Sequence, residues 1–414
     1  MTNNPNSFPR KTDILMLVDT HVYDDSRVMP EGSSLAQAGY TVRVIGLARF
    51  GGLPVQNQIN GMEILLAPME TVRTSIQFFC ALWRWICGDT NTVNHPTPTY
   101  KTSNIFSIIF FSLWMLRLGL NRPAKVIHCH DLLQLPTGWL LSRWHRAKLV
   151  YDSHESAEHT HAQVSKRFGQ FAAFLERVFA PKTDAVIAVG ERVGEDIRKQ
   201  GANRVVVIGN WKKLEHFAPD HVRLKAERER LALNKSKLVI SYLGSLYYLR
   251  NLEQLLEAVI QSPDVHLIIS GQGPLEYLVH NALPHASNIH WLGWLKKADV
   301  DFYTQLSDVV YCCIHPTYYQ ADYVVPNKLF EAFAAGKALI AYKGVGEMSQ
   351  ILESFPAALL LDPVTPETLK LAFQQLQHSE TLHQLQRAAI MARKTYNWAV
   401  AEKRLLDLYS ELTL

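Results

Sequence analysis

The sequence predicts an α/β protein with two doubly wound, Rossmann-like domains. Short apolar runs such as residues 13–18 and 238–243 recur along the chain, and such runs are typical of parallel strands buried on both faces. Stretches with helical spacing separate these runs, which indicates strand–helix–strand units. A chain of 414 residues is also too long for a single ordinary core. We therefore expect two such domains that face each other over a cleft.

The composition excludes several classes of protein. A hydrophobic content of 48% with 19% charged residues excludes a disordered chain. The net charge of +4 is small and its Lys and Arg are scattered, so we expect no nucleic-acid partner. The 5 cysteines form no CxxC pair, which favours a reducing cytoplasm. No signal peptide is visible, and the polar residues 1–10 are expected to be a disordered lead-in.

Polar side chains follow most strands of the first half. Two such endings are His128-Cys129-His130-Asp131 and Asp152-Ser153-His154-Glu155. Ligands of open α/β sheets bind at the carboxyl ends of strands, so these residues are candidates for a site. The expected elements, in order, are strand 13–18, polar loop 19–28, helix 33–38, strands 40–47, 62–67 and 125–129, a helix through 141, strands 148–151 and 185–189, a helix from 191, and strand 204–208.

An apolar helical insert is expected at residues 70–120. It contains Ile76 to Cys87 and Asn104 to Leu120, separated by a loose polar stretch. Neither segment is a clean membrane span, because each carries an Arg and both are short. We favour buried core helices over amphipathic helices that lie on a membrane surface, and both interpretations stay open.

A domain linker is expected at residues 211–235, which are charged and lack periodicity. The second domain then follows the same strand–helix pattern, and a final helix at residues 400–412 could return to the first domain. The expected elements are strands 238–243, 265–270, 288–292, 309–314 and 338–342, with helices at 251–261 and 298–305.

The stretch from residue 322 to 341 predicts a loop, a helix and a buried strand. Pro326 suits the first turn of a helix, and Gly336 suits its end. Lys328 and Glu331 lie one turn apart at the start of this helix. They could bind the phosphate and ribose ends of a nucleotide, or they could form an ordinary i, i+3 surface pair.

Searches for other catalytic motifs fail. No GxGxxG follows a strand, no GxxxxGK[ST] loop exists and no GxSxG elbow is present, so a dinucleotide cofactor, a P-loop and an α/β-hydrolase are not indicated. His154 to His161 is rich in His and Glu but lacks the zincin spacing. No metal site is expected.

In its motifs the chain resembles the retaining glycosyltransferases of family 4, which have the GT-B fold. The resembling segments occur in the family's order and fall on the expected loops. They are "DSRV" at 25–28, "VIHCHDLLQLP" at 126–136, "LVYDSHE" at 149–155, "LGSLYYLRNLEQLLEAV" at 243–259, "ISGQGP", "IHWLGWL", "VPNKLFEAFAAGKALIA" at 325–341 and "YNWAVAEKRLLDLY" at 396–409. The resemblance implies an acceptor-side domain at 1–215, a donor domain at 216–393 and a returning helix at 394–414.

The resemblance implies sugar transfer from a nucleoside-diphosphate sugar to a hydroxyl acceptor, with retention and without a metal or another cofactor. The acceptor would be a sugar, a small molecule, a lipid-linked group or a surface polysaccharide precursor. The expected location is the cytoplasm, with peripheral contact at the inner face of the membrane. The alternatives are a sugar-nucleotide epimerase of the same fold and a non-catalytic protein that binds sugar nucleotides.

By the same resemblance, Arg250 and Lys328 would stabilise the charge of the departing diphosphate. Cations with a helix N-terminus are a reasonable substitute for a metal. Glu331 would accept hydrogen bonds from ribose hydroxyls, and backbone groups at Trp294 and Leu295 would hold the base.

The loop before this helix combines family features with departures from the family. Pro326 and Asn327 would shape the phosphate loop. Tyr323 stands where many members have a Glu that contacts the donor sugar, and Ser245 stands where many have Arg. The later Gly-Gly loop becomes Gly346 followed by Glu. These changes concern the choice of sugar more than the nucleotide.

The N-terminal half is expected to supply His130 at the reacting end of the sugar. The alternative for His130 is a histidine that is simply satisfied at the end of a strand. The other acceptor-side residues implied are Asp25, Arg27, Asp131, His154 and Glu155.

Overall fold

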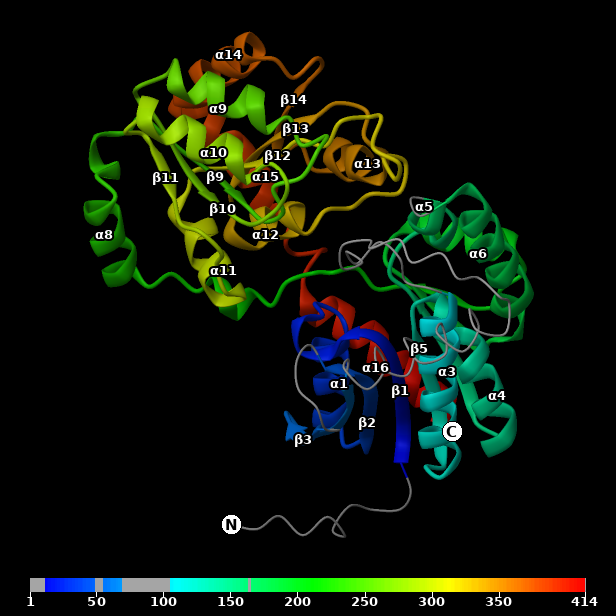
Figure 1. Ribbon diagram of the computed structural model, residues 1–414. Coiled ribbons are helices and arrows are strands. Elements are labelled where there is room, and N and C mark those ends of the chain that lie inside the picture. Colours follow the sequence, from blue (N-terminus) through cyan, green and yellow to red (C-terminus); the bar gives the residue numbers. More distant parts are fainter. Residues whose placement is uncertain (1–11, 49–54, 69–104, 163–164, 414) are drawn as a thin grey trace, which may run out of the picture. The chain divides into compact units, whose positions relative to one another are not determined.

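The structure is a computed structural model that describes residues 12–48, 55–68, 105–162 and 165–413. The chain divides into two compact units (Figure 1). Unit 1 comprises Met1–Ile208 and Glu402–Leu414, and unit 2 comprises Gly209–Ala401. The expected lead-in at 1–10 and the insert as far as residue 104, including the apolar segment 76–87, lie outside the described residues.

Unit 1 contains an eight-stranded sheet in the order β3-β4-β2-β1-β5-β6-β7-β8. All neighbouring strands are parallel except β3 and β4. The elements are β1 Thr12–His21, α1 Val28–Gln37, β2 Val42–Ala48, β3 Val55–Ile59, β4 Met62–Pro68, α3 Ile105–Leu120, β5 Ala124–His130, α4 Leu135–His145, β6 Lys148–Ser153, α5 Ala157–Ala162, α6 Lys166–Phe179, β7 Ala185–Ala188, α7 Glu191–Lys199, β8 Val205–Val207 and most of α16 Trp398–Thr413.

The winding of this sheet reverses at β1. The chain first moves from β1 to β2 and β4, then returns to β5 on the other side of β1 and continues to β8. Parallel crossovers are right-handed, so the connections on the two sides place their helices on opposite faces. Helices α3, α4, α6 and α7 therefore share one layer, and Figure 1 labels the first three of them. The reversal between β1 and β5 is where such sheets hold ligands.

Unit 2 contains a six-stranded, wholly parallel sheet in the order β11-β10-β9-β12-β13-β14. Its reversal lies between β9 and β12. The elements are α8 His221–Arg230, β9 Leu238–Leu243, α9 Leu252–Ile260, β10 Val265–Ser270, α10 Glu276–Ala282, β11 Ile289–Trp291, α11 Lys297–Leu306, β12 Val309–Cys312, α12 Asn327–Ala335, β13 Ala338–Tyr342, α13 Gly346–Ser354, β14 Ala358–Leu361, α14 Pro366–Gln377 and α15 Ser379–Ala392.

The two-domain α/β prediction is confirmed, with local corrections. Helix α1 begins at Val28 rather than at residue 33, because Pro30 is tolerated in a first turn and Asp25 accepts hydrogen bonds from the amides of Arg27 and Val28. Gly32 lies inside the helix because it packs against Met62, whose sulfur would be 2.3 Å from an added Cβ. Strands β3 and β14 were not predicted: β3 is mostly polar, and the apolar run of β14 is only 4 residues long.

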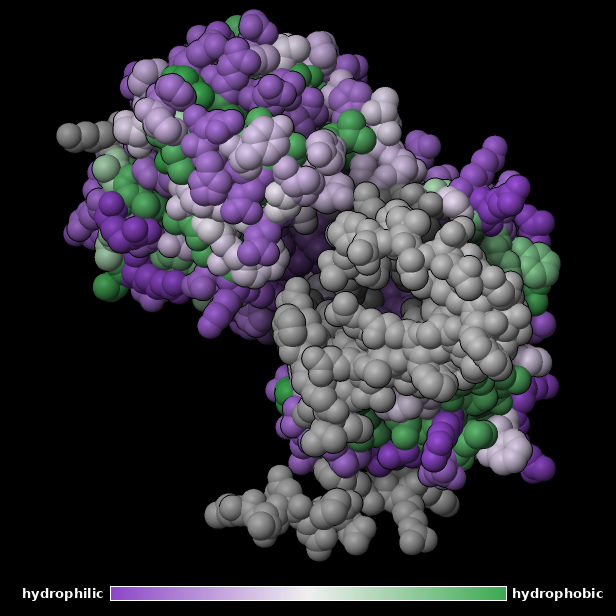
Figure 2. Space-filling model, in the orientation of Figure 1, coloured by the Kyte–Doolittle hydropathy of each residue, from purple (hydrophilic) through white to green (hydrophobic). Residues whose placement is uncertain are grey.

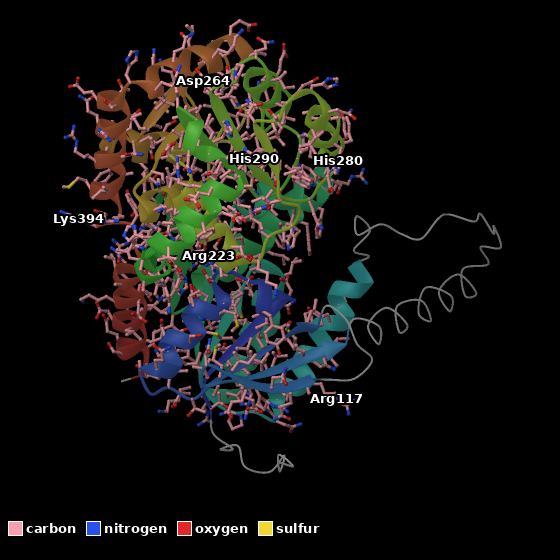
Figure 3. All side chains as sticks on the ribbon, turned by 90° about the vertical axis from the view of Figure 1, so that its left-hand side faces the viewer. Arg117, Arg223, Asp264, His280, His290 and Lys394 are labelled. Carbon is pink, nitrogen blue, oxygen red and sulfur yellow. The ribbon has the colours of Figure 1, made fainter. Side chains whose placement is uncertain are left out.

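The expected linker contains a helix, α8, which was not predicted because its residues are mostly charged and show no apolar periodicity. Asp220 caps this helix by accepting a hydrogen bond from the amide of Arg223. The guanidinium of Arg223 lies 3.8 Å from the ring centre of Phe302 and pairs with Asp299, both in α11 (Figure 3). Tertiary contacts therefore hold α8, and it has no buried face that would make it periodic.

Ile105–Leu120 of the expected apolar segment forms α3, which is half buried. Phe111 and Met115 are buried, whereas Ile109 and Leu113 are 50% and 58% exposed. Neither the core interpretation nor the surface interpretation therefore describes the whole helix. In the part of the chain that the structure describes, no helix is both long and apolar enough to span a bilayer.

The final helix, α16, belongs to unit 1 from Glu402 onward. Its Tyr409 is fully buried, and its hydroxyl lies 2.6 Å from Nδ1 of His128 in β5. The expected return of this helix to the first domain is thus seen in the contacts of unit 1.

Candidate functional site

In unit 1, His130 and Asp152 meet at the carboxyl edge of the sheet. Nδ1 of His130 lies 3.0 Å from Oδ2 of Asp152 and 3.2 Å from Nε2 of His154. That nitrogen of His154 lies 2.9 Å from the same Asp152 oxygen. Nε2 of His130 is buried and has no hydrogen-bond partner among the described residues. Asp152 therefore fixes the ring through Nδ1, and Nε2 is the atom left to engage another group.

His130 and Asp152 are both fully buried. A substrate could contact Nε2 of His130 only after a neighbouring segment moves. The alternative was that His130 only forms hydrogen bonds at the end of a strand. This describes Nδ1, which has partners, but not Nε2, which has none among the described residues. A buried polar atom without a partner is costly, which marks this position as unusual.

The predicted acceptor-side role of Arg27 needs correction. Its side chain is 3% exposed, and it donates from Nε to Asp152 over 3.1 Å and from Nη1 to the carbonyl oxygen of Ile208 over 2.6 Å. It also pairs with Glu31 over 3.2 Å. The buried anion of Asp152 needs a buried counter-charge, and this requirement draws Arg27 into the domain. Arg27 thus positions Asp152 and does not face a substrate in this structure.

The pKa values of the buried residues in this cluster are shifted in different directions. Burial would raise the pKa of Asp152, but Arg27 and His154 outweigh it and hold that pKa well below its usual range. Burial would lower the pKa of His154, but Asp131 and Asp152 raise it to about 10. Burial and Asp152 together raise the pKa of Glu31 to about 8. At neutral pH Asp152 is thus an anion between two cations, and Glu31 is largely protonated.

The backbone of Asp131 is strained. Its φ is 64° and its ψ is 159°, a region that residues other than glycine rarely adopt and that costs about 1–3 kcal/mol. Its amide donates to the carbonyl oxygen of Asp152 over 2.9 Å, and its carboxylate lies 3.5 Å from Nδ1 of His154. These contacts with Asp152 and His154 hold Asp131 in its strained conformation beside the cluster.

Two other predicted acceptor-side residues have structural partners. Asp25 accepts from the amides of Arg27 and Val28 and so caps α1. Burial would raise its pKa, but His154 and the other positive groups lower it, which places Asp25 near the cluster. Glu155 is exposed and accepts from the hydroxyl of Thr160 in α5.

Four buried residues of unit 1 could in principle hold a metal ion. Glu31, His128, His130 and Asp152 each offer an atom, all within 4.8 Å of one another. The guanidinium of Arg27 already pairs with both carboxylates. A second cation would be repelled by it, so the donor set fits a metal poorly.

In unit 2, loops that follow three neighbouring strands interlock at the carboxyl edge of the sheet. The amide of Leu246 donates to Gln272 and that of Gly271 to Gly293. A Cβ on Gly271 would lie 1.8 Å from the carbonyl oxygen of Gly244. Only glycine permits this approach, which brings backbone groups from the three loops together.

Lys328 and Arg250 converge beside these loops. Lys328 lies in the first turn of α12, and its Nζ would be 2.7 Å from a Cβ added to Gly244. Burial lowers the pKa of Lys328, and the nearby charges of Arg250 and Lys212 lower it further, whereas Glu331 opposes them. Among the described residues neither cation forms a salt bridge. Nζ of Lys328 lies 4.6 Å from the ring centre of Tyr242, and the guanidinium of Arg250 lies 4.7 Å from that of Tyr318.

Glu331 has a partner that was not predicted. Its Oε1 lies 3.3 Å from Nζ of Lys212, which also donates to Oδ1 of Asn327 over 3.1 Å. The surface pair between Lys328 and Glu331 does not form. Pro326 is the N-cap of α12 with φ −70°, which confirms its predicted place at the start of this helix.

The remaining donor-side residues follow strands β9 and β11 of the same sheet. Trp294 is 62% exposed, and Leu295 packs on the core that includes Val239 and Leu243. The backbone carbonyl of Ser245 accepts from the hydroxyl of Tyr242. These residues place polar backbone groups and the exposed ring of Trp294 at the carboxyl edge of the sheet in unit 2.

Gly346 packs on the turn that leads into Tyr323, in the loop before α12. The amide of Tyr323 donates to Gln320, and a Cβ on Gly346 would lie 2.2 Å from the carbonyl oxygen of Ala321. Gly346 therefore allows the start of α13 to pack on this loop, which carries the position where the family pattern breaks.

Sequence reasoning named Asp152 only within its strand ending and gave it no role, and it missed Glu31 and Lys212. Asp152 precedes His154 by two residues, and that spacing places both side chains on one face of a strand, so this signal was available. Glu31 and Lys212 carry no such signal, because a helix that contains Gly and Pro and a segment without periodicity supply them.

Comparison with known proteins decides the family. Residues 26–211 match the model described as Glycosyl transferase 4-like domain, and residues 225–397 match Glycosyl transferases group 1. The chain belongs to the GT-B glycosyltransferases of family 4. An uncharacterized glycosyltransferase of Methanocaldococcus jannaschii is 23% identical over 342 residues, which are 76% of this chain and 82% of that protein.

Two solved structures show the same fold as this glycosyltransferase. Sucrose-phosphate synthase from Thermosynechococcus elongatus has a TM-score of 0.70 at 17% identity and covers 97% of this chain and 99% of its own. HepE of Anabaena, solved in complex with UDP and glucose, has a TM-score of 0.68 at 15% identity and covers 97% and 100%. The protein is thus a transferase enzyme, and these comparisons do not favour the epimerase or the non-catalytic alternative.

Proposed function

We propose that this glycosyltransferase moves a sugar from a nucleoside-diphosphate sugar to a hydroxyl acceptor, with retention of configuration and without a resident metal. The observation that carries the proposal is the convergence of Lys328 and Arg250 at the N-terminus of α12. Together with Lys212 they place three cations near the carboxylate of Glu331. Such an excess of positive charge beside glycine-rich backbone is suited to a diphosphate.

The charges support a role in bond cleavage. When the bond between the anomeric carbon and the diphosphate breaks, negative charge grows on the leaving diphosphate. A bond forms between that carbon and the acceptor oxygen, and the proton of the acceptor hydroxyl passes to the departing diphosphate. Lys328, Arg250 and the α12 N-terminus would stabilise this charge more in the transition state than in the ground state. Glu331, oriented by Lys212, would accept hydrogen bonds from the ribose.

The acceptor side is assigned to unit 1. Nε2 of His130 is the atom that would contact the reacting sugar once exposed, with Asp152 and Arg27 as positioning residues. We propose a lipid-linked or polysaccharide-precursor acceptor at the cytoplasmic side of a membrane, because α3 exposes large apolar side chains. The solved HepE complexes with UDP and glucose support a nucleotide-sugar donor only by likeness of fold.

The test measures nucleotide binding and transfer separately. Thermal shift with UDP, GDP and ADP should show a rise in melting temperature for one base, since a ligand at about a hundred times its Kd adds roughly 2.7 kcal/mol of stability. Lys328→Met and Arg250→Met should lose this shift, and Lys343→Met, an exposed lysine of unit 2, should keep it. If both site variants bind the nucleotide as well as the wild type, the donor site is assigned wrongly.

Transfer is then followed with the matching sugar nucleotide, and NMR of the anomeric carbon reports the configuration of the product. Activity should persist in EDTA. An inverted product would overturn retention, and loss of activity in EDTA that Mg²⁺ restores would overturn metal-free transfer.

A further inference from the structure

We propose that the outer faces of α3, α4 and α6 form a docking surface for an anionic lipid bilayer. This inference rests on the proposed function for its biological sense, because an acceptor held in a membrane would be reached from that surface. Its evidence lies in unit 1 alone, and its test needs no catalysis.

Each of the three helices exposes a pair of large apolar side chains at helical spacing. On α3 these are Ile109 and Leu113, four residues apart, and the buried side of the helix carries Phe111 and Met115. The other pairs are Leu140 with Trp144 on α4 and Phe171 with Phe174 on α6. Trp144 is 69% exposed, the largest exposed fraction among these six side chains.

The three pairs lie on one layer of the unit. Helices α3, α4 and α6 cover the same face of the sheet, because they belong to right-handed crossovers that run in one direction. An added Cβ on Gly119 of α3 would lie 2.5 Å from Leu141 of α4, and Trp139 of α4 packs edge-on against Phe179 of α6. The helices are thus direct neighbours, and Figure 2 shows hydrophobic side chains where Figure 1 draws α3 and α4.

The fourth helix of this layer provides an internal comparison. The exposed positions of α7 are Glu191, Glu195, Arg198 and Lys199, and no large apolar side chain is exposed there. Apolar exposure is therefore not a general property of the layer. It is confined to the three adjacent helices, and clustered exposure of this kind marks interaction surfaces.

The exposed charges on the three helices themselves are of one sign, whereas Glu158 of α5, which packs on α6, is exposed and acidic. The exposed charged residues on α3, α4 and α6 are Arg117, Arg143, Lys166, Arg167 and Arg177. Arg117 projects at the margin of unit 1 in Figure 3. The acidic residue of these helices is Glu176, which is buried and accepts from the hydroxyl of Tyr151. Basic side chains that flank apolar ones, with an exposed Trp, are the pattern of a helix face that binds anionic headgroups and inserts shallowly.

A second copy of the chain fits this surface less well. A two-fold symmetric dimer would bring the same basic side chains of both copies together, with no exposed carboxylate on these helices to compensate. An anionic bilayer instead complements every exposed charge on these three helices. Each basic residue near such a surface strengthens binding about fivefold.

The test is co-sedimentation of the whole chain with vesicles of phosphatidylglycerol and phosphatidylcholine, and with phosphatidylcholine alone. We expect binding to the anionic vesicles that weakens at least tenfold in 0.5 M NaCl, and little binding to the neutral ones. Trp144→Glu combined with Phe174→Glu should lose binding. Arg143→Glu combined with Arg177→Glu should lose it as well, without altering any apolar side chain.

Leu371→Glu is the matched control, because Leu371 is an apolar side chain of α14 in unit 2 that is 58% exposed. It should bind vesicles as the wild type does. Failure of the wild type to bind anionic vesicles, or equal loss in the control, would overturn the proposal. A wild-type dimer in sedimentation equilibrium that Trp144→Glu dissociates would assign the surface to a second copy instead.

The outcome is separable from that of the proposed function. The two double variants, Trp144→Glu alone and the Leu371→Glu control should all keep the wild-type thermal shift with the nucleotide. None of the changed residues is Lys328, Arg250, Lys212 or Glu331, which form the proposed donor site. If a surface variant loses vesicle binding but keeps nucleotide binding, the docking surface is supported independently of the donor site. If the wild type does not bind the nucleotide, the proposed donor site is wrong whatever the vesicle result.

Discussion

The ammonium of Lys212 lies 3.3 Å from a carboxylate oxygen of Glu331 and 3.1 Å from the amide oxygen of Asn327. Lys212 is 8% exposed and comes from the first residues of unit 2, about 115 positions earlier in the chain than the helix that it contacts. It therefore fixes the first turn of α12 from outside that helix. The carboxylate expected to bind ribose has its orientation set by a lysine that no motif contains.

Replacement of Lys212 by Met should weaken nucleotide binding about tenfold, which corresponds to about 1.4 kcal/mol. The reason is that Glu331 and Asn327 lose their shared donor and can adopt other rotamers. Isothermal titration with the nucleotide diphosphate measures the change. The neighbouring Lys213→Met removes the same charge without these contacts and should bind as the wild type; equal weakening in both variants would mean that only net charge matters.

Replacement of Asp152 by Asn should destabilise the chain by about 3 kcal/mol, because Arg27 and His154 would be left buried without their counter-ion. Denaturant unfolding of the variant and the wild type measures this. Asp196→Asn, which breaks the exposed pair with Lys199, should change stability by less than about 0.5 kcal/mol. A stability loss for Asp152→Asn as small as that of the control would contradict the buried network.

Replacement of Gly271 by Ala should both destabilise the chain and abolish the nucleotide shift. The new Cβ would lie 1.8 Å from the carbonyl oxygen of Gly244, so the interlocked loops must separate. Gly344→Ala is the control, since its φ of 75° is equally unsuited to alanine but open space surrounds it. That variant should lose only about 1 kcal/mol and keep nucleotide binding. If both variants behave alike, the close approach is not required.

Replacement of Asp301 by Asn should stabilise the chain more at pH 8 than at pH 5. Burial, with the charge of Glu331, raises the pKa of Asp301 from 3.8 to about 6. The folded state thus holds this proton more tightly than the unfolded state, and the resulting stability is lost as the pH rises through 6. Asn avoids that loss, so its advantage should grow by about 1 kcal/mol between pH 5 and pH 8.

Thermal unfolding of both proteins at the two pH values measures the difference. Asp299→Asn changes an exposed carboxylate of the same helix and should show no such dependence on pH. An advantage for Asp301→Asn that is independent of pH would mean that burial does not perturb its titration.

The sequence by itself determined the fold class, most strands and the positions of Lys328, Glu331 and Pro326 on one helix. These features are local, because strand runs, helical spacing and a proline before a helix depend on residues close together in the chain. The resemblance to family 4 was recognisable for the same reason, since its motifs are short and continuous.

Tertiary structure alone decided which charges neutralise one another. Arg27 was expected at a substrate and is instead enclosed with Asp152, 125 residues away, while Glu331 pairs with Lys212 rather than with Lys328 one turn away. Burial decides such pairing, because an enclosed charge takes whichever partner the packing of distant segments brings within reach. No local sequence pattern therefore predicts these ion pairs.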